Sequence, residues 1–156
     1  MRIEELGERI SKELEGLAPK VDLEHPIVVV SVGAERLPEA ASRLSRMGFD
    51  HVKSVTATDY TDEKRVELVY HISSYEDWNL VTFIIALKTS VPPENPRITS
   101  LTYIWPSAEF LERETFDLVG VIFEGHPKLT RLLLPDDWEG SPLLKSFKIK
   151  TEGIEV

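Results

Sequence analysis

The densest group of chemically capable residues lies in the segment 109–140, EFLERETFDLVGVIFEGHPKLTRLLLPDDWEG. It combines glutamates and aspartates with two arginines and one histidine, set between apolar runs. Carboxylates beside a fixed histidine could perform general acid–base catalysis. The same charges could instead orient and hold a protein–protein contact. The spacing of these residues gives little support to the catalytic use.

A carboxylate pair is the first catalytic possibility. Glu112 and Glu114 are two residues apart, so on a helix they point about 200° from each other and cannot share one substrate. His126 lies in a Gly-His-Pro turn that fixes its backbone, as a catalytic base would need. A structural histidine, hydrogen-bonded to a neighbouring carboxylate, is the commoner role for such a residue. The catalytic alternative is a stand-alone acid–base enzyme using Glu114, His126 and Asp136.

Cofactor and metal motifs are absent from the sequence. There is no glycine-rich phosphate loop and no GxSxG nucleophile elbow. The four histidines are scattered, and the chain has no cysteine, which excludes a cysteine-ligated iron–sulfur cluster within it. Asp136 and Asp137 lie in PDDWEG, which lacks the alternating ligands of a calcium loop and predicts a turn. We therefore expect no cofactor and no metal in this chain.

Composition limits the partners. The 156 residues suit one domain with its own core, and a formal net charge of −9 disfavours nucleic acid and anionic membrane surfaces. The longest apolar run, at 80–87, is far shorter than a spanning helix requires, and the charged N-terminal stretch lacks the apolar core of a signal peptide. We expect a cytoplasmic protein without membrane insertion. Scarce Asn, Gln and Cys suggest a thermophilic source.

Periodicity predicts an α+β fold, with helices packed on a mixed or antiparallel sheet. Helices are expected at 2–16 and from Pro38 to Gly48, and strands at 26–33, 51–60, 65–74 and 80–89, the last apolar on both faces and therefore central. Residues 98–105 are expected to form a short helical or turn segment. Residues 1–140 are then one domain, and 141–156 an extended C-terminal arm.

A further helix is expected from Ser107, acting as its cap, to about Leu118. An apolar stripe is predicted for it at Ala108, Leu111, Thr115 and Leu118. Arg113 and Asp117 fall on the far side, four residues apart and able to pair. Phe110 and Phe116 also point away from the stripe, so the helix carries two apolar faces. Either the chain's own C-terminal tail or a partner protein covers the second face.

The segment resembles the signature of the thirty-kilodalton subunit family of respiratory complex I, which includes related subunits of archaeal membrane-bound hydrogenases. That signature is ERE, an aromatic residue and Asp, a GHP run, an L-x-R step and PDDWEG. The matching positions are Glu112, Arg113, Glu114, Phe116, Asp117, Gly120, Phe123, Gly125, His126, Pro127, Leu129, Arg131, Leu134, Pro135, Asp136, Asp137, Trp138, Glu139 and Gly140. The family often continues with HPLRKDF, where this chain has SPLLKSF; the departure leaves the type of complex open.

The resemblance implies a cofactor-free subunit of the peripheral arm of a complex-I-like oxidoreductase, either an NADH–quinone oxidoreductase or a ferredoxin-dependent membrane-bound hydrogenase. It implies docking against a hydrogenase-like large subunit, near the small iron–sulfur subunit, and an interface formed by the motif residues. Arg113 and Arg131 would pair with carboxylates, while Phe110, Phe116 and Trp138 would be apolar anchors. The rivals are the acid–base enzyme named above and a small regulatory module that binds a metabolite.

Overall fold

The computed structural model describes residues 1–135, 137 and 140–142. Within these residues, three α-helices and seven strands follow one another, with two short 3-10 turns, Ala34–Arg36 (η1) and Thr61–Glu63 (η2), between them. The helices are α1 (Ile3–Glu13), α2 (Leu37–Arg46) and α3 (Ala108–Val119). The strands are β1 (Lys20–Glu24), β2 (Ile27–Ser31), β3 (His51–Tyr60), β4 (Arg65–Ser73), β5 (Ile84–Val91), β6 (Arg97–Thr99) and β7 (Ile122–Glu124).

Five strands form the main sheet in the order β1-β2-β5-β4-β3. The pair β2–β5 is parallel, with Val29 opposite Ala86, while the other pairs are antiparallel. β5 is therefore the central strand, which explains why it is apolar on both faces. The prediction of an α+β fold with a mixed sheet is confirmed.

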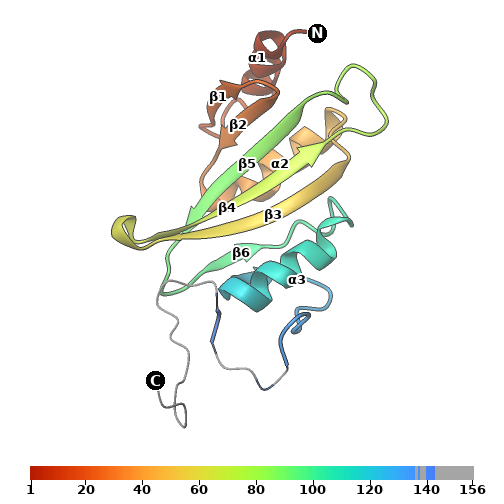
Figure 1. Cartoon of the computed structure of the whole chain (residues 1–156). Helices are drawn as coiled ribbons and strands as arrows, with labels where there is room; N and C mark the ends of the chain where they lie inside the picture. The colour runs from red at the N-terminus through yellow and green to blue at the C-terminus, as the bar shows by residue number, and fades with distance from the viewer. Residues whose placement is uncertain (136, 138–139, 143–156) are drawn as a thin grey trace, which may run out of the picture.

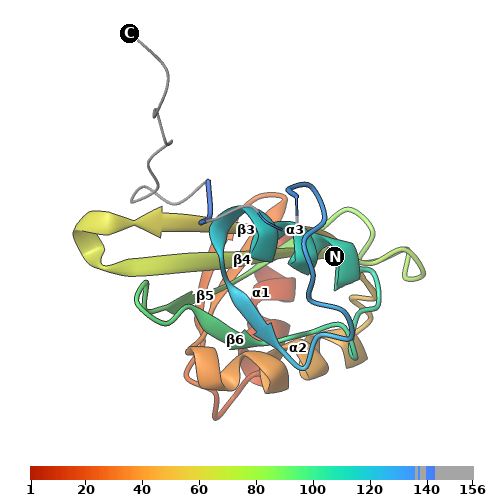
Figure 2. The same ribbon diagram turned by 90° about the horizontal axis from the view of Figure 1, so that it is seen from below.

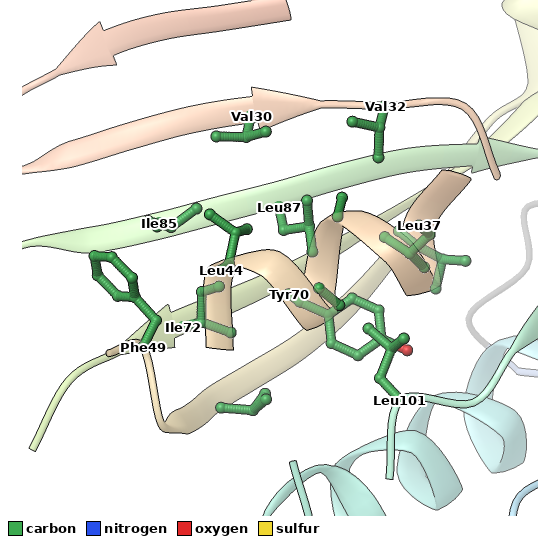
Figure 3. Packing of buried hydrophobic residues seen from close by; sticks show 14 of the residues in the cluster. Val30, Val32, Leu37, Leu44, Phe49, Tyr70, Ile72, Ile85, Leu87 and Leu101 are labelled. Carbon is green, nitrogen blue, oxygen red and sulfur yellow. The ribbon is translucent and has the colours of Figure 1, made fainter. Parts of the chain in front are cut away.

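Helices α1 and α2 cover one face of this sheet (Figures 1 and 2). Each presents an apolar stripe at helical spacing, such as Leu6 and Ile10 in α1 and Leu37 and Leu44 in α2, all without solvent exposure. The stripes pack on alternate residues of the strands, including Val30, Leu87 and Ile85 (Figure 3). The opposite face carries only a small apolar centre of Val29, Val69 and Ala86, with partly buried Ile27.

Helix α3 lies beside β3, the edge strand of the sheet (Figure 1). The Ser107 hydroxyl accepts a hydrogen bond from the Val52 N–H at 3.0 Å, and the Thr115 hydroxyl donates to the Val55 carbonyl at 3.3 Å. These contacts satisfy backbone groups that an edge strand otherwise leaves open. Ser107 does occupy the N-cap position of α3, as predicted. Its side chain makes no cap hydrogen bond, however, and binds β3 instead.

Short strands β6 and β7 form a separate parallel pair next to α3. Gly120 ends the helix in a left-handed conformation with φ of 86°, and its N–H bonds the Phe116 carbonyl at 2.9 Å. A Cβ at this position would stand 2.5 Å from the Ser141 hydroxyl oxygen. Glycine therefore serves both the turn and the close approach of residue 141.

The expected elements at 2–16, 26–33, 51–60 and 65–74 are confirmed with small shifts of their ends. Two strands were missed, β1 and β7. In the expected helical or turn segment, Ile98 and Thr99 belong to strand β6, whereas residues 102–104 do form a turn. Residues 80–83 form a turn, so the central strand begins only at Ile84. The predicted arm at 141–156 lies almost wholly outside the described residues and stays a prediction.

Candidate functional interface

Glu112 is fully buried where α3 meets the sheet and the turn after β6. Its carboxylate accepts hydrogen bonds from the Tyr70 hydroxyl at 2.9 Å, the Ser100 hydroxyl at 2.6 Å and the Leu101 N–H at 2.8 Å. Desolvation raises the pKa of Glu112 above its ordinary value, and the three donors offset only part of this effect. The same burial and the facing Glu112 carboxylate raise the pKa of Tyr70 well above its ordinary value. Glu112 thus joins α3 to β4 and to the turn after β6.

Asp117 has no solvent exposure and binds the loop that follows β7. One carboxylate oxygen accepts the N–H groups of Leu133 and Leu134 at 2.6 and 2.9 Å, with a weaker contact from Leu132 at 3.3 Å. The other oxygen accepts from the Arg131 guanidinium at 3.1 Å. Desolvation by itself would raise the pKa of Asp117, but these hydrogen bonds outweigh it and hold the pKa below its ordinary value.

Arg113 does not pair with Asp117, so the pairing predicted from the helical wheel is wrong, and its side chain is buried within the chain. Its guanidinium donates to the Thr130 hydroxyl at 3.1 Å and lies 3.7 Å from the Glu109 carboxylate, one turn back on α3. It also lies 5.6 Å from the centre of the Phe110 ring. The physical reason is that residues 126–134 fold back over this side of α3 and bury it, which a local wheel cannot reveal.

His126 helps to fix the start of this loop. Its Nδ1 accepts the Lys128 N–H at 2.9 Å, and its Nε2 is 2.9 Å from the Glu109 carbonyl. Since Nδ1 is an acceptor, the hydrogen resides on Nε2 and is donated to the carbonyl. These contacts fit a structural role for His126, although its partner is a backbone carbonyl and not the carboxylate that was expected.

The acid–base alternative finds little support in this geometry. Glu114 is exposed and lines a shallow hollow with Val55 and Thr115, against β3. His126 instead contacts Glu109, which lies about 140° around the helix from Glu114 at 100° per residue. The structure therefore does not bring Glu114 and His126 together, and both ring nitrogens of His126 are engaged.

Of the PDDWEG segment, residues 135–140, the structure describes Pro135, Asp137 and Gly140. Pro135, Asp137 and Gly140 are exposed, and the Gly140 carbonyl accepts from Arg131 at 3.2 Å. Gly125 has φ of 83° at the turn before His126. Asp136 and Trp138 lie outside the described residues, so the predicted roles of Trp138 as an anchor and Asp136 as a catalytic group stay untested.

Glu112, Arg113, Asp117 and His126 are thus engaged in contacts within the chain, and large apolar side chains are exposed near them. Phe110 on α3, Tyr103 before it and Leu133 in the following loop are 62%, 69% and 60% exposed. We call these three residues, with the hollow of about 350 Å³ between Tyr103, Pro106, Glu109 and Pro127, the α3 surface. Phe116, the other predicted anchor, is half-buried against the core, with Arg131 5.8 Å from its ring centre.

Sequence reasoning missed Tyr103 and Leu133. The run RLLLP, three leucines in a loop between an arginine and a proline, was a signal for Leu133, because loops seldom carry such runs without a contact to make. Nothing local pointed to Tyr103.

No metal or membrane site emerges from the described residues. Within them, no three His, Asp or Glu side chains come close enough together to hold a metal ion. No helix among them has the length and apolar character needed to cross a bilayer.

The fold and its motif define an α+β domain in which a charged helix fastens its own loop beside an exposed apolar surface. The family model of the respiratory-chain NADH dehydrogenase 30 kDa subunit matches residues 30–153. The chain therefore belongs to that family.

Similar sequences and solved structures support this family assignment. A subunit of the NADH-quinone oxidoreductase of Moorella thermoacetica is 39% identical over 147 residues, covering 92% of this chain and 97% of the relative. Among solved structures, a trypsin-resistant fragment of Nqo5 superposes with a TM-score of 0.69 at 30% identity, covering 83% of this chain and all of the fragment. A chain of the membrane-bound sulfane sulfur reductase, an archaeal respiratory membrane complex, superposes with a TM-score of 0.82 at 27% identity, covering 97% of this chain and 89% of that one.

Proposed function

We propose that this protein is a structural subunit of the peripheral arm of a complex-I-like membrane-bound oxidoreductase, held to the membrane only through its partners. Membership of the 30 kDa subunit family supports the class of complex. Similarity both to an NADH-quinone oxidoreductase subunit and to a chain of a sulfane sulfur reductase complex leaves the electron donor and acceptor open. The chain itself carries no redox centre in this proposal, since it has no cysteine to bind a cluster.

The observation that carries the proposal is the internal use of the motif. Glu112, Asp117 and His126 each have their polar atoms engaged by neighbours in the same chain, so they are not poised for turnover. The contacts of Arg113, Asp117 and His126 fix the loop 126–134, with its exposed Leu133, on the helix that carries exposed Phe110. Rigid surfaces that present aromatic and aliphatic side chains are typical of the anchors in stable interfaces. The α3 surface is the docking site for the hydrogenase-like large subunit in this proposal.

A replacement of Phe110 by Glu tests the docking site. Because the ring is 62% exposed, we expect the melting temperature of the free chain to change by no more than a few degrees. Recovery of the chain with the large subunit should fall at least tenfold, since an aromatic anchor contributes about 2 kcal/mol or more. The matched control is Leu23→Glu, which removes an exposed apolar side chain from β1, the opposite edge of the sheet. Equal recovery of both variants would contradict the assignment of the α3 surface.

Metal analysis tests the absence of a redox centre. Protein prepared without a metal-affinity tag should contain less than about 0.1 iron, nickel or zinc per chain. One metal per chain would refute this part of the proposal.

A further inference from the structure

A second group of exposed apolar side chains lies on the loop between β4 and β5. Within residues 74–83, Trp78 is 90% exposed, Tyr75 61% and Val81 44%. A tryptophan that buries almost none of its surface is rare on an isolated soluble chain, because its ring offers about 150–250 Å² of apolar area. We call residues 74–83 the Trp78 loop.

The Trp78 loop is firmly held, so this exposure does not follow from a lack of contacts. The Asp50 carboxylate accepts the N–H groups of Tyr75 and Glu76 at 3.0 and 3.2 Å. The Tyr75 ring stacks on His51, with 4.3 Å between ring centres. Leu80, with 1% exposure, fixes the far side of the loop in the core. The loop therefore displays Trp78 on a preformed frame, which lowers the entropy cost of binding.

The surroundings of Trp78 are acidic. A hollow of about 520 Å³ is bounded by Trp78 and by three carboxylate residues, Asp50, Glu76 and Asp77. Among the described residues that line it, there is no lysine or arginine. An indole face beside carboxylates matches the chemistry of an arginine or lysine side chain, whose cation stacks on the ring while it pairs with the acids.

The Trp78 loop and the turn that leads into α3 are both bound by the two residues that precede β3. The Asp50 carboxylate accepts from the Tyr75 N–H of the loop, and the Phe49 carbonyl accepts from the Trp105 indole of the turn at 2.8 Å. Figures 1 and 2 place the β4–β5 loop and this turn at the same end of the sheet. One partner, or two neighbouring partners, can therefore reach both surfaces.

We propose that the Trp78 loop is a second docking surface, which receives an arginine- or lysine-bearing segment of a neighbouring protein subunit. This inference rests on the proposed function, since it places the partner within the same complex. The Trp78 loop differs from the α3 surface in two ways. It contains no residue of the family motif, and the partner side chain that it would bind is a cation.

Thiol footprinting tests the proposal, because a chain without cysteine accepts single-cysteine reporters. The reporters are Asn79→Cys beside Trp78, Lys128→Cys at the α3 surface, and Lys12→Cys on α1 as the control; all three side chains are exposed. Alkylation of each variant is followed by mass spectrometry of this chain, free and in the purified complex. We expect Asn79→Cys and Lys128→Cys to react at least tenfold more slowly in the complex, and Lys12→Cys to react equally in both states.

The outcomes separate the two proposals. Protection of Lys128→Cys without protection of Asn79→Cys would overturn the second surface and leave the α3 surface standing. A chain that does not enter the complex, or is protected at neither reporter, would overturn both.

Charge reversal tests the cationic partner. In the Asn79→Cys background, Glu76→Lys should restore fast alkylation within the complex, whereas Glu114→Lys, the reversal of an exposed carboxylate on α3, should leave the protection unchanged. Equal protection in the two double variants would show that the occupant is not cationic and would overturn the proposal.

Discussion

Replacement of Asp117 by alanine tests whether the charged motif fastens the loop 126–134 to α3. The change removes the acceptor of the Leu133 and Leu134 N–H groups and the carboxylate that faces Arg131. Hydrogen bonds to a charged group contribute about 1.5–3 kcal/mol each, but they do not add, and exposed Leu133 can bind water after the loss. We estimate a loss of about 3 kcal/mol in the free energy of unfolding.

The estimate predicts a fall in melting temperature of roughly 6–12 °C for a chain of this size. Detachment of the loop alone would limit the global loss, so hydrogen exchange at the Leu133 and Leu134 amides should be measured beside calorimetry. Asp117→Asn keeps an acceptor for these amides and loses only the charge opposite Arg131. It should therefore cost less, about 1–2 kcal/mol.

The matched control is Glu114→Ala, which removes an exposed carboxylate from the same helix and should change stability by less than about 0.5 kcal/mol. If Asp117→Ala melts within about 1 °C of the unaltered chain, with unchanged exchange at Leu133 and Leu134, then Asp117 does not hold the loop and the reasoning is wrong.

The two buried carboxylates should respond to pH in opposite directions. The folded-state pKa of Asp117 is lowered, so its stabilising contribution is present above its unfolded pKa and is lost as the pH falls through the folded value. Asp117→Asn should abolish this loss at acid pH when stability is measured against pH. The folded-state pKa of Glu112 is raised, so its contribution to stability is present below its unfolded pKa and is lost as the pH rises through the folded value. In Glu112→Gln that loss should vanish, and denaturant titrations from acid to neutral pH would detect the difference. Gly120→Ala should destabilise by at least about 1–2 kcal/mol in urea titrations because of its positive φ, and an unchanged midpoint would contradict the role given to the turn. Leu44→Ala, at a site with no exposure, should cost about 2–5 kcal/mol by the same titration, and a loss below about 1 kcal/mol would mean that α2 does not pack as described.

Elements with a one-sided pattern were the predictable part of the fold. The stripes of α1 and α2 and the alternation of β4 report burial directly, because each packs a single face on the core. β1, with the sequence KVDLE, is an almost wholly exposed edge strand, so it carries no such pattern. β6 and β7 are three residues each and exist only as partners of one another, which no local window can detect.

The candidate interface, like the fold, was only partly predictable from the sequence. The motif spacing led to the family, and the position of Phe110 away from the apolar stripe was predicted, but the partners of the charged side chains were not. The helical wheel predicted a second covered face on this helix but could not show whether the chain itself or a partner covers it. α3 lies between β3 and its own following loop, and that loop buries Arg113 and Asp117.

The sequence by itself determined the helix and strand periodicities of the first ninety residues, the lack of cysteine ligands and the family to which the chain belongs. Only the tertiary structure decided which charges are used inside the chain and which apolar side chains remain outside. The pairs Tyr70–Glu112 and Asp117–Arg131 join residues 42 and 14 positions apart, so they depend on how the sheet, α3 and the loop are placed together. Local sequence fixes local geometry, but a buried carboxylate finds its donors only after distant segments have packed around it.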